Sequence, residues 1–205
     1  MNTSDPTFAG VVLAGGASRR FHGQKALATF NGQPFYQRAI SMIEPYVDQM
    51  TIVVKPELKE KLILNETTIV IEDEPEIAGF GPLAGIYSAM NAIHADWYLV
   101  LAVDMPLMDA YTIKQLIKCT EIKGEQAHIP FIEGRIQPLA ALYHISCKEV
   151  IYHQLLNKHY RISDLFQKVQ TKQWSEKDLS VSTAVFQNVN DRSTYEQLRK
   201  QRSNG

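Results

Sequence analysis

Runs of mostly apolar residues alternate with amphipathic segments along the first half of the chain. Each run is short and bounded by glycine or polar residues, which is the pattern of a strand buried on both faces of a sheet. We expect such strands at residues 8–13, 50–54, 68–71 and 97–103. Between them, apolar residues recur at helical spacing, and Asp109 is placed to cap a helix. The predicted helices cover residues 34–47, 83–93 and 109–119.

The second half of the chain has a more mixed pattern. Two apolar segments flank Glu133-Gly134-Arg135, and this spacing predicts a hairpin with strands at 127–132 and 136–143. The remaining apolar positions predict short helices, one further strand and a closing polar helix. These elements are expected at residues 146–156, 162–168, 181–186 and from about 193 onward.

This order of elements predicts a three-layer α/β fold with a mostly parallel sheet, formed by residues 1–205 as a single domain. Ligands bind such sheets beyond the carboxyl ends of the strands. The residues that directly follow Leu13, Val54, Ile71 and Val103 are therefore the first candidates for a functional site.

Composition narrows the class of protein. Of 205 residues, 45% are hydrophobic and 21% charged, and the net charge of -1 gives no global attraction to nucleic acid or to a membrane surface. The beginning of the chain lacks the basic segment of a secretory signal, and the longest uncharged stretch is interrupted by glycine and proline. Two cysteines without zinc-site spacing indicate reduced thiols, so we expect a cytoplasmic protein.

A glycine-rich segment follows the first predicted strand. Gly15 and Gly16 allow backbone N–H groups to approach an anion, and Arg19, Arg20 and Lys25 add three positive charges nearby. The segment lacks both the Walker ending and the dinucleotide-binding spacing. Phosphate binding is the functional interpretation, and a tight turn with solvated arginines is the structural alternative.

Two aspartates follow other predicted strands. Asp104 comes after the strongest central strand and before Met105-Pro106, where a carboxylate beside a polyphosphate would suit magnesium. Asp73 lies within Glu72-Asp73-Glu74 and would face the same crevice. Each also has a plainer interpretation, since Asp104 could be an ordinary turn residue and residues 72–74 a solvated acidic turn.

A polar segment, Asn188-Val189-Asn190-Asp191, precedes the last predicted helix. In an extended segment Asn188 and Asn190 would point the same way, whereas Asp191 is a plausible helix cap. Turn chemistry alone also explains this composition.

Taken together, these segments resemble the molybdenum cofactor guanylyltransferase family over nearly the whole chain. Four of the matching motifs are shared with other nucleotidyltransferases, and two in the second half narrow the match to the molybdopterin branch. The first shared motif is Leu13-Ala14-Gly15-Gly16, followed by Ser18, Arg20, Gly23 and Lys25. The other three are Asn31-Gly32-Gln33-Pro34, Gly81-Pro82-Leu83-Ala84-Gly85 and Asp104-Met105-Pro106. The narrowing motifs are Gln137-Pro138-Leu139-Ala140 and Asn188-Val189-Asn190. The chain has Lys55 where the family often has asparagine, and His22 where a small residue is frequent.

The resemblance implies a Rossmann-like fold of the nucleotide-diphospho-sugar transferase type and a set of site residues. Asp104 is implied as the magnesium ligand, Asn188 and Asn190 as pterin contacts, and Lys25 and Arg20 as catalytic residues together with Asp104. The nucleotide contacts implied by position are Leu13, Ala14, Gly15, Gly16, Lys25, Asp73 and Asp104.

The implied reaction transfers GMP from Mg-GTP to the terminal phosphate of molybdopterin and releases pyrophosphate. Recipient molybdoenzymes or their chaperones and an accessory GTP-binding protein are the further partners that this resemblance suggests. A pterin cytidylyltransferase and a sugar-1-phosphate nucleotidyltransferase are the alternatives among enzymes, because base choice depends on a few hydrogen bonds. A non-catalytic cofactor carrier is the alternative from another class, although it would not need both Lys25 and Asp104.

Overall fold

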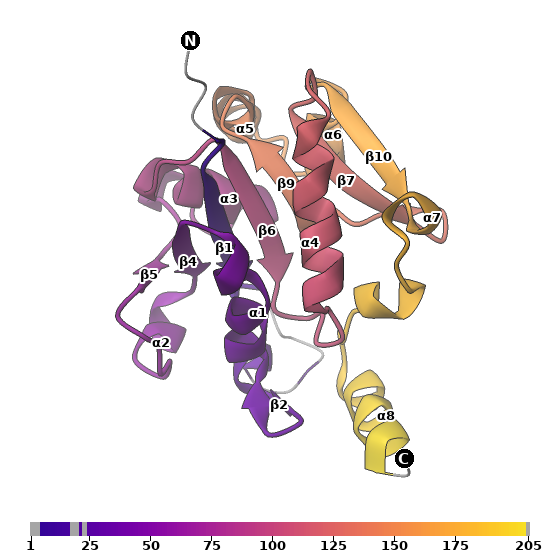
Figure 1. Ribbon diagram of the computed structural model, residues 1–205. Helices are drawn as coiled ribbons and strands as arrows, with labels where there is room; N and C mark the ends of the chain where they lie inside the picture. Colours follow the sequence, from indigo (N-terminus) through magenta and orange to yellow (C-terminus); the bar gives the residue numbers. More distant parts are fainter. Residues whose placement is uncertain (1–4, 17–20, 22–23, 204–205) are drawn as a thin grey trace.

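The computed structural model describes residues 5–16, 21 and 24–203 of the chain. Among these residues the main sheet has eight strands, in the order β10-β7-β9-β6-β1-β4-β5, with β8 paired to β7 (Figure 1). The strands are β1 (Phe8–Leu13), β4 (Gln49–Val53), β5 (Thr68–Ile71), β6 (Trp97–Ala102), β7 (Ala127–Ile132), β8 (Arg135–Ile136), β9 (Ala140–His144) and β10 (Thr171–Ser175). A separate short hairpin pairs β2 (Thr29–Phe30) with β3 (Gln33–Pro34).

Most strands of the sheet run in the same direction. β1 is parallel to both β4 and β6, β4 is parallel to β5, and β10 is parallel to β7. β9 runs antiparallel to its neighbours β6 and β7, and β8 runs antiparallel to β7. The predicted mostly parallel sheet is therefore confirmed.

Helices cover both faces of the sheet and complete three layers. Alternate residues of each central strand point to opposite faces, so Val12 and Leu99 belong to one core cluster and Val11 and Val100 to the other. The first cluster includes residues of α1 and α4, and the second residues of α3 and α5; Figure 1 shows α4 in front of the sheet and α3 behind it. The helices are α1 (Phe35–Ile43), α2 (Pro56–Lys59), α3 (Pro82–Ala92), α4 (Ala110–Lys118), α5 (Cys147–Leu156), α6 (Ile162–Leu165), α7 (Glu176–Leu179) and α8 (Arg192–Ser203).

Local sequence signals set the beginnings of two helices. The Asp109 carboxylate accepts a hydrogen bond from the backbone N–H of Thr112 at 2.8 Å, as the predicted cap of α4 requires. Asp191 accepts from the backbone N–H of Thr194 at 2.8 Å, at the beginning of α8. The predicted helix at 34–47 ends earlier, at Ile43, and the chain continues as a 3-10 turn over Glu44–Tyr46.

The prediction of a strand at residues 181–186 was wrong. Thr183–Phe186 form a 3-10 helix, and the Ser182 hydroxyl accepts a hydrogen bond from the backbone N–H of Ala184 at its beginning. Val185 and Phe186 are buried in the core, so the segment has the apolar character of a strand. Among the described residues it pairs with no strand of the sheet. The eighth strand is instead β10, whose sequence is largely polar.

The predicted hairpin exists but is interrupted. Glu133 and Gly134 both have positive φ and form its two-residue turn, with Ile132 opposite Arg135. The returning segment then leaves the ladder between Ile136 and Ala140 and re-enters the sheet as β9, between β6 and β7. This detour brings Leu139 to the carboxyl end of β6, where its carbonyl accepts from the N–H of Ala102 at 2.8 Å.

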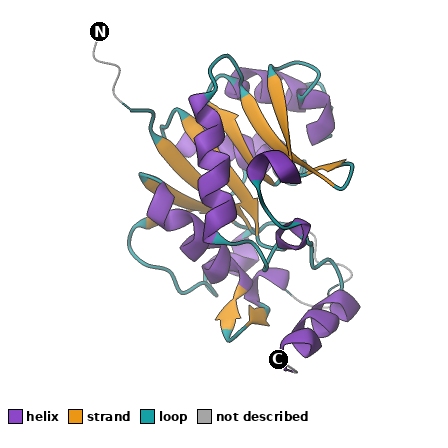
Figure 2. Cartoon of the chain, turned by 45° about the vertical axis from the view of Figure 1, so that its right-hand side comes forward, coloured by secondary structure: helices purple, strands orange, loops and turns teal. Residues whose placement is uncertain are grey.

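The strand order reverses beside β1. From β1 the chain proceeds outward to β4 and β5 and then returns to form β6 on the other side of β1. A crevice is expected at the carboxyl ends of β1 and β6. These ends, the β2–β3 hairpin and α8 lie at the same end of the molecule (Figures 1 and 2).

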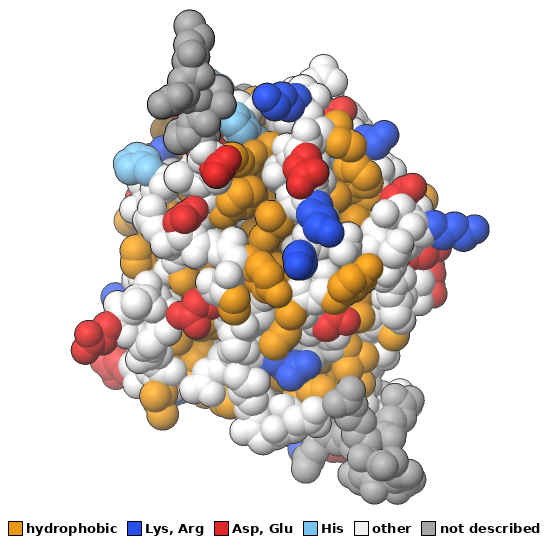
Figure 3. Space-filling view, in the orientation of Figure 1, with side chains coloured by type: hydrophobic (Ala, Val, Ile, Leu, Met, Phe, Trp, Pro, Cys, Tyr) orange, Lys and Arg blue, Asp and Glu red, His pale blue; other side chains and the backbone are white. Residues whose placement is uncertain are grey.

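The surface has no dominant charge on the face that α4 covers. In Figure 3 acidic and basic side chains are interspersed there with apolar ones. Among the described residues, no helix combines the length and the apolar character that crossing a membrane would require.

Candidate active site

A cavity of about 460 Å³ opens at the carboxyl ends of the central strands, at the predicted place. It is lined by residues that follow β1, β4, β5 and β6, together with the beginning of α3 and the segment before β9. The lining residues include Leu13, Ala14, Gly15, Gly16, Lys25, Lys55, Glu72, Asp73, Gly79, Gly85, Asp104 and Leu139.

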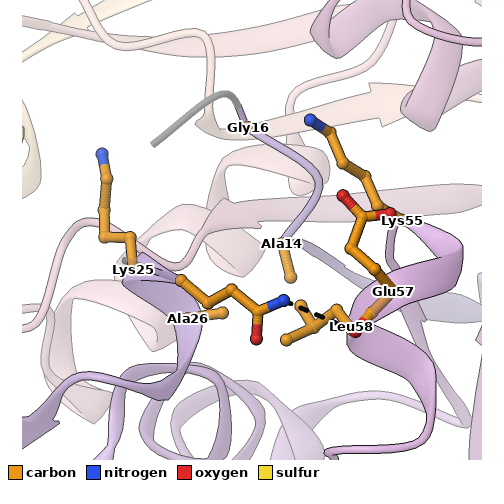
Figure 4. Close-up of a pocket in the computed structure, with 8 residues that line it drawn as sticks. Ala14, Gly16, Lys25, Ala26, Lys55, Glu57 and Leu58 are labelled. Carbon is orange, nitrogen blue, oxygen red and sulfur yellow. Dashed lines mark hydrogen bonds between the residues drawn. The ribbon is translucent and has the colours of Figure 1, made fainter. Parts of the chain in front are cut away.

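The segment from Ala14 to Gly16 separates this cavity from a smaller one of about 240 Å³. Ala14, Gly16, Lys25 and Lys55 line both. Figure 4 shows Lys25 and Lys55 on either side of this segment. Among the described residues, none has an atom within 4 Å of a Cβ added at Gly16. Two cations therefore flank a glycine segment that lines both cavities, an arrangement that suits an anion.

Lys25 connects two distant parts of the chain. Its ammonium donates to Asp104 Oδ2 at 3.0 Å and to Asn190 Oδ1 at 3.0 Å. The side chains of Lys25 and Asp104 are 14% and 20% exposed, so this ion pair is largely shielded from bulk water. Charges at such a site interact more strongly than charges on the open surface.

The other carboxylate oxygen of Asp104, Oδ1, is buried and has no hydrogen-bond partner among the described residues. A buried carboxylate oxygen without a donor is costly unless a ligand satisfies it. No cluster of three or more His, Cys, Asp or Glu residues suited to a metal occurs in the described part of the chain. One carboxylate fits magnesium, which often takes one or two protein carboxylates and fills its other positions with phosphate oxygens and water.

Asp73 also lines the cavity. Its Oδ2 accepts a hydrogen bond from the backbone N–H of Gly79 at 3.2 Å. Burial raises the pKa of the Asp73 carboxyl above its ordinary value, and the Gly79 hydrogen bond and the charge of Lys55 partly oppose this rise. The neighbouring Glu74 is held elsewhere, because its carboxylate accepts from Asn91 Nδ2 at 2.8 Å and its N–H donates to Ser88 Oγ at 2.8 Å. Asp73 therefore belongs to the cavity rather than to a purely solvated acidic turn.

The asparagine segment before α8 runs past the turn at Asp104. The backbone N–H of Val189 donates to the carbonyl of Asp104 at 2.8 Å, and the Val189 side chain is fully buried. This hydrogen bond places Asn190 beside Lys25. Asn188 is half-buried, and neither asparagine lines the 460 Å³ cavity.

Helix α8 also contacts the segment around the glycine loop, which the sequence did not predict. The Tyr195 ring packs edge-on against Phe21 and Phe35, with centroids 5.4 and 5.9 Å apart. Its hydroxyl donates to the carbonyl of Thr29 at 2.7 Å. Tyr195 and Leu198 are three positions apart in the predicted last helix, and both are buried. This spacing of large apolar residues is the sequence signal that one face of the helix packs against the rest of the fold.

The structure brings most of the predicted site residues to one cavity. Those that line it are Leu13, Ala14, Gly15, Gly16, Lys25, Asp73 and Asp104. Arg20 and its neighbour Arg19 lie outside the described residues, as does His22. The sequence did not single out Leu139 or Gly79 as site residues. Each lies in a loop, and the path of that loop is what brings it to the cavity. Lys55, which departs from the family's frequent asparagine, lines both cavities.

Comparison with known proteins agrees with this geometry. Residues 10–173 match the family model described as MobA-like NTP transferase domain. A probable molybdenum cofactor guanylyltransferase of Bacillus anthracis is 36% identical over 197 residues, covering 96% of this chain and 98% of the relative. One from Bacillus subtilis is 37% identical over 185 residues, covering 90% and 91%.

A solved structure extends the agreement to the fold. The crystal structure of molybdopterin-guanine dinucleotide biosynthesis protein A from Archaeoglobus fulgidus superposes with a TM-score of 0.81 at 22% identity. The superposition covers 96% of this chain and 100% of that one. Both the sequence match and the relatives span most of its length, so the chain belongs to the MobA-like NTP transferase family, among the molybdenum cofactor guanylyltransferases.

Proposed function

We propose that this chain transfers GMP from Mg-GTP to the terminal phosphate of molybdopterin. An oxygen of the acceptor phosphate attacks the α-phosphorus of GTP, the bond from that phosphorus to the bridging oxygen breaks, and pyrophosphate leaves. The observation that carries the proposal is the Lys25–Asp104 pair at 3.0 Å, largely shielded from water beside the glycine segment.

Lys25 addresses the main electrostatic problem of this reaction. The attacking phosphate and the triphosphate are both anions, so they repel each other unless cations at the site reduce their charge. The Lys25 ammonium, the N–H groups of Gly15 and Gly16, and Lys55 are the described groups that can do this. Fixed donors align attack and departure without reorganising during the reaction.

Asp104 would hold the magnesium ion through its buried Oδ1, the oxygen with no partner among the described residues. When bound, the ion supplies Lewis-acid stabilisation of charge on the phosphate oxygens. Lys25 contacts the other oxygen, Oδ2, so the carboxylate is held in one orientation. Since the acceptor phosphate is already an anion near neutral pH, the chain needs no general base for this step.

Guanine choice is the part of the proposal that rests on family membership. Asp73 is the side chain that we assign to accept hydrogen bonds from the guanine N–H groups. It lines the cavity, and its carboxylate can accept further hydrogen bonds besides the one from the backbone N–H of Gly79. Sites built from a few placed hydrogen bonds discriminate strongly between bases that do and do not fit them.

The test is pyrophosphate release by the full chain supplied with molybdopterin-bearing cofactor and magnesium, with GTP, CTP and ATP in parallel. Asp104→Ala serves as the blank. Asp109→Asn is the matched control, because it removes a carboxylate charge five positions away while keeping a good helix cap. Release with GTP alone, retained by the control, supports guanylyl transfer.

Two other outcomes would contradict the proposal in different ways. Release with CTP alone would retain the mechanism and change the product to the cytosine dinucleotide form. No release with any nucleotide, together with tight pterin binding, would make the chain a cofactor carrier on a transferase fold.

A further inference from the structure

The Lys25 ammonium lies between two oxygen acceptors that come from very different parts of the chain. Asp104 Oδ2 and Asn190 Oδ1 are each 3.0 Å from Nζ, and Lys25 and Asn190 are 165 positions apart. An ammonium group has three N–H donors on a flexible stem. Two acceptors from distant parts of the chain therefore restrict where this cation can lie.

Asn190 is held rigidly enough to act as such an acceptor. The residue before it, Val189, is fully buried and its N–H donates to the Asp104 carbonyl at 2.8 Å. The residue after it, Asp191, caps α8 by accepting from Thr194 at 2.8 Å. Both neighbours of Asn190 are therefore held, and the backbone of Val189 is bonded to the same residue whose side chain contacts Lys25.

The amide suits this position for an electrostatic reason. A lysine side chain loses about 2 kcal/mol of rotamer freedom when it is held in one place. A neutral carbonyl oxygen orients the ammonium and reduces that loss at the moment of binding. It does so without adding a negative charge where a triphosphate must enter, as a second carboxylate would.

We propose that Asn190 is a positioning residue that holds the Lys25 ammonium beside Asp104, ready to contact the triphosphate. This inference rests on the proposed function for the identity of the nucleotide, and it assigns Asn190 a different task from direct contact with the pterin. It implies that removing the Asn190 amide weakens nucleotide binding through Lys25, whereas a pterin contact would weaken acceptor binding.

A double-mutant cycle separates the two roles. The variants are Asn190→Ala, Lys25→Met and the combination of both, with Gln187→Ala as an exposed control three positions upstream. The measurement is the dissociation constant of a GTP analogue with a methylene group between its α- and β-phosphorus atoms, in the presence of magnesium. Calorimetry on the full chain gives it without turnover, and molybdopterin binding is measured on the same samples.

We expect Asn190→Ala to weaken analogue binding about 3- to 10-fold in the native background, in the range of one ordinary hydrogen bond, because Asn190 acts on the ligand only through Lys25. In the Lys25→Met background the same change should have less than about a twofold effect, because the group that it positions is gone. The control should bind the analogue normally. Unfolding measured by denaturant should show that all variants remain folded under the binding conditions.

Equal weakening in both backgrounds would overturn the proposal, since Asn190 would then act independently of Lys25. Unchanged analogue binding with weakened molybdopterin binding would also overturn it and would assign Asn190 to binding of the acceptor.

The cycle is repeated with the corresponding CTP analogue, because the proposed role of Lys25 is to contact the phosphates and not the base. Coupling seen only with that analogue would sustain the role of Asn190 while contradicting guanylyl transfer, and failure of the native chain to bind either analogue would overturn both.

Discussion

The hydroxyl of Tyr195 donates to the backbone carbonyl of Thr29 at 2.7 Å, joining residues 166 positions apart. Thr29 begins the β2–β3 hairpin, which follows the glycine segment in the chain, and Phe21 within that region packs on the Tyr195 ring. Helix α8 therefore packs against the side of the molecule where we propose that the nucleotide binds.

Tyr195→Phe and Tyr195→Ala should differ in what they remove. The phenylalanine variant loses one hydrogen bond and should lower the free energy of unfolding by about 1 kcal/mol with little change in nucleotide affinity. The alanine variant also loses the ring contacts with Phe21 and Phe35 and should lower it by about 3 kcal/mol or more. Its affinity for GTP should fall as well. Denaturant unfolding and calorimetry check both expectations, and equal GTP affinity in all three proteins would contradict the supporting role.

Two glycine substitutions should separate packing from ligand binding. A Cβ at Gly10 would lie 2.6 Å from both Ile43 Cγ2 and Met50 Sδ in the closed core. Gly10→Ala should therefore cost about 1 to 3 kcal/mol of stability and leave the GTP affinity of the folded fraction unchanged. Denaturant unfolding gives the first quantity and calorimetry at low temperature the second.

At Gly85 the space is limited by the cavity wall instead. An added Cβ would lie 2.9 Å from Leu13 Cδ2 and 3.6 Å from Asp73 Oδ1. The Leu13 side chain must shift to make room, which lowers stability. Alanine favours the helix more than glycine does, which raises it, so the net change in unfolding free energy should be less than about 1 kcal/mol. GTP affinity should fall about tenfold. Normal GTP binding by Gly85→Ala would show that the nucleotide does not occupy this side of the cavity.

His128 predicts a pH dependence of stability. The His128 ring is fully buried between Trp97 and Trp174; Nδ1 accepts from Trp174 Nε1 at 3.2 Å, and Nε2 has no partner among the described residues. Burial lowers the pKa of His128 from its ordinary value of 6.5 to about 4. The unfolded chain therefore binds the proton more readily, and stability falls as the pH decreases from 6.5 towards 4.

The variant His128→Gln should remove this contribution. Between pH 7 and pH 4 the native chain should lose up to about 3 kcal/mol more unfolding free energy than the variant. Chemical denaturation at a series of pH values measures the difference, with His153→Gln as the control at a histidine outside this aromatic cluster. Parallel pH profiles for native and His128→Gln proteins would contradict the assignment.

Asp104→Asn tests the metal role more finely than truncation does. The amide retains an oxygen that can accept from Lys25 but loses the charge that a divalent cation prefers. We expect turnover to fall by about 10²-fold or more and to require a higher magnesium concentration, with the unfolding free energy changed by less than about 1 kcal/mol. A magnesium titration of pyrophosphate release measures this, and an unchanged titration curve would remove Asp104 from the ligand role.

Strands buried on both faces could be read from the sequence, because burial on two sides leaves few polar positions. Every residue of β6 is buried, and this strand was predicted nearly to the residue. Edge strand β10 was missed for the opposite reason. Lys172 and Gln173 are exposed and its other residues are only partly buried, so its parallel pairing with β7 is what makes it a strand.

The same distinction applies to the site. Asp73 and Asp104 could be placed in one crevice because the carboxyl ends of parallel strands meet at one edge of a sheet. The contact between Lys25 and Asn190 could not be predicted, because it depends on how the segment before α8 passes the turn at Asp104. The assignment of Asn188 and Asn190 to the pterin remains a prediction.

The bond between Lys25 and Asn190 also bears on synthesis of the protein. Lys25 emerges early from the ribosome, whereas its partner emerges 165 residues later. The parallel strands β1, β4, β5 and β6 can pair well before that, so a nascent chain can hold a formed sheet and still lack a fixed Lys25. Premature termination ahead of Asn190 would then yield a chain that lacks one of the two acceptors of the Lys25 ammonium.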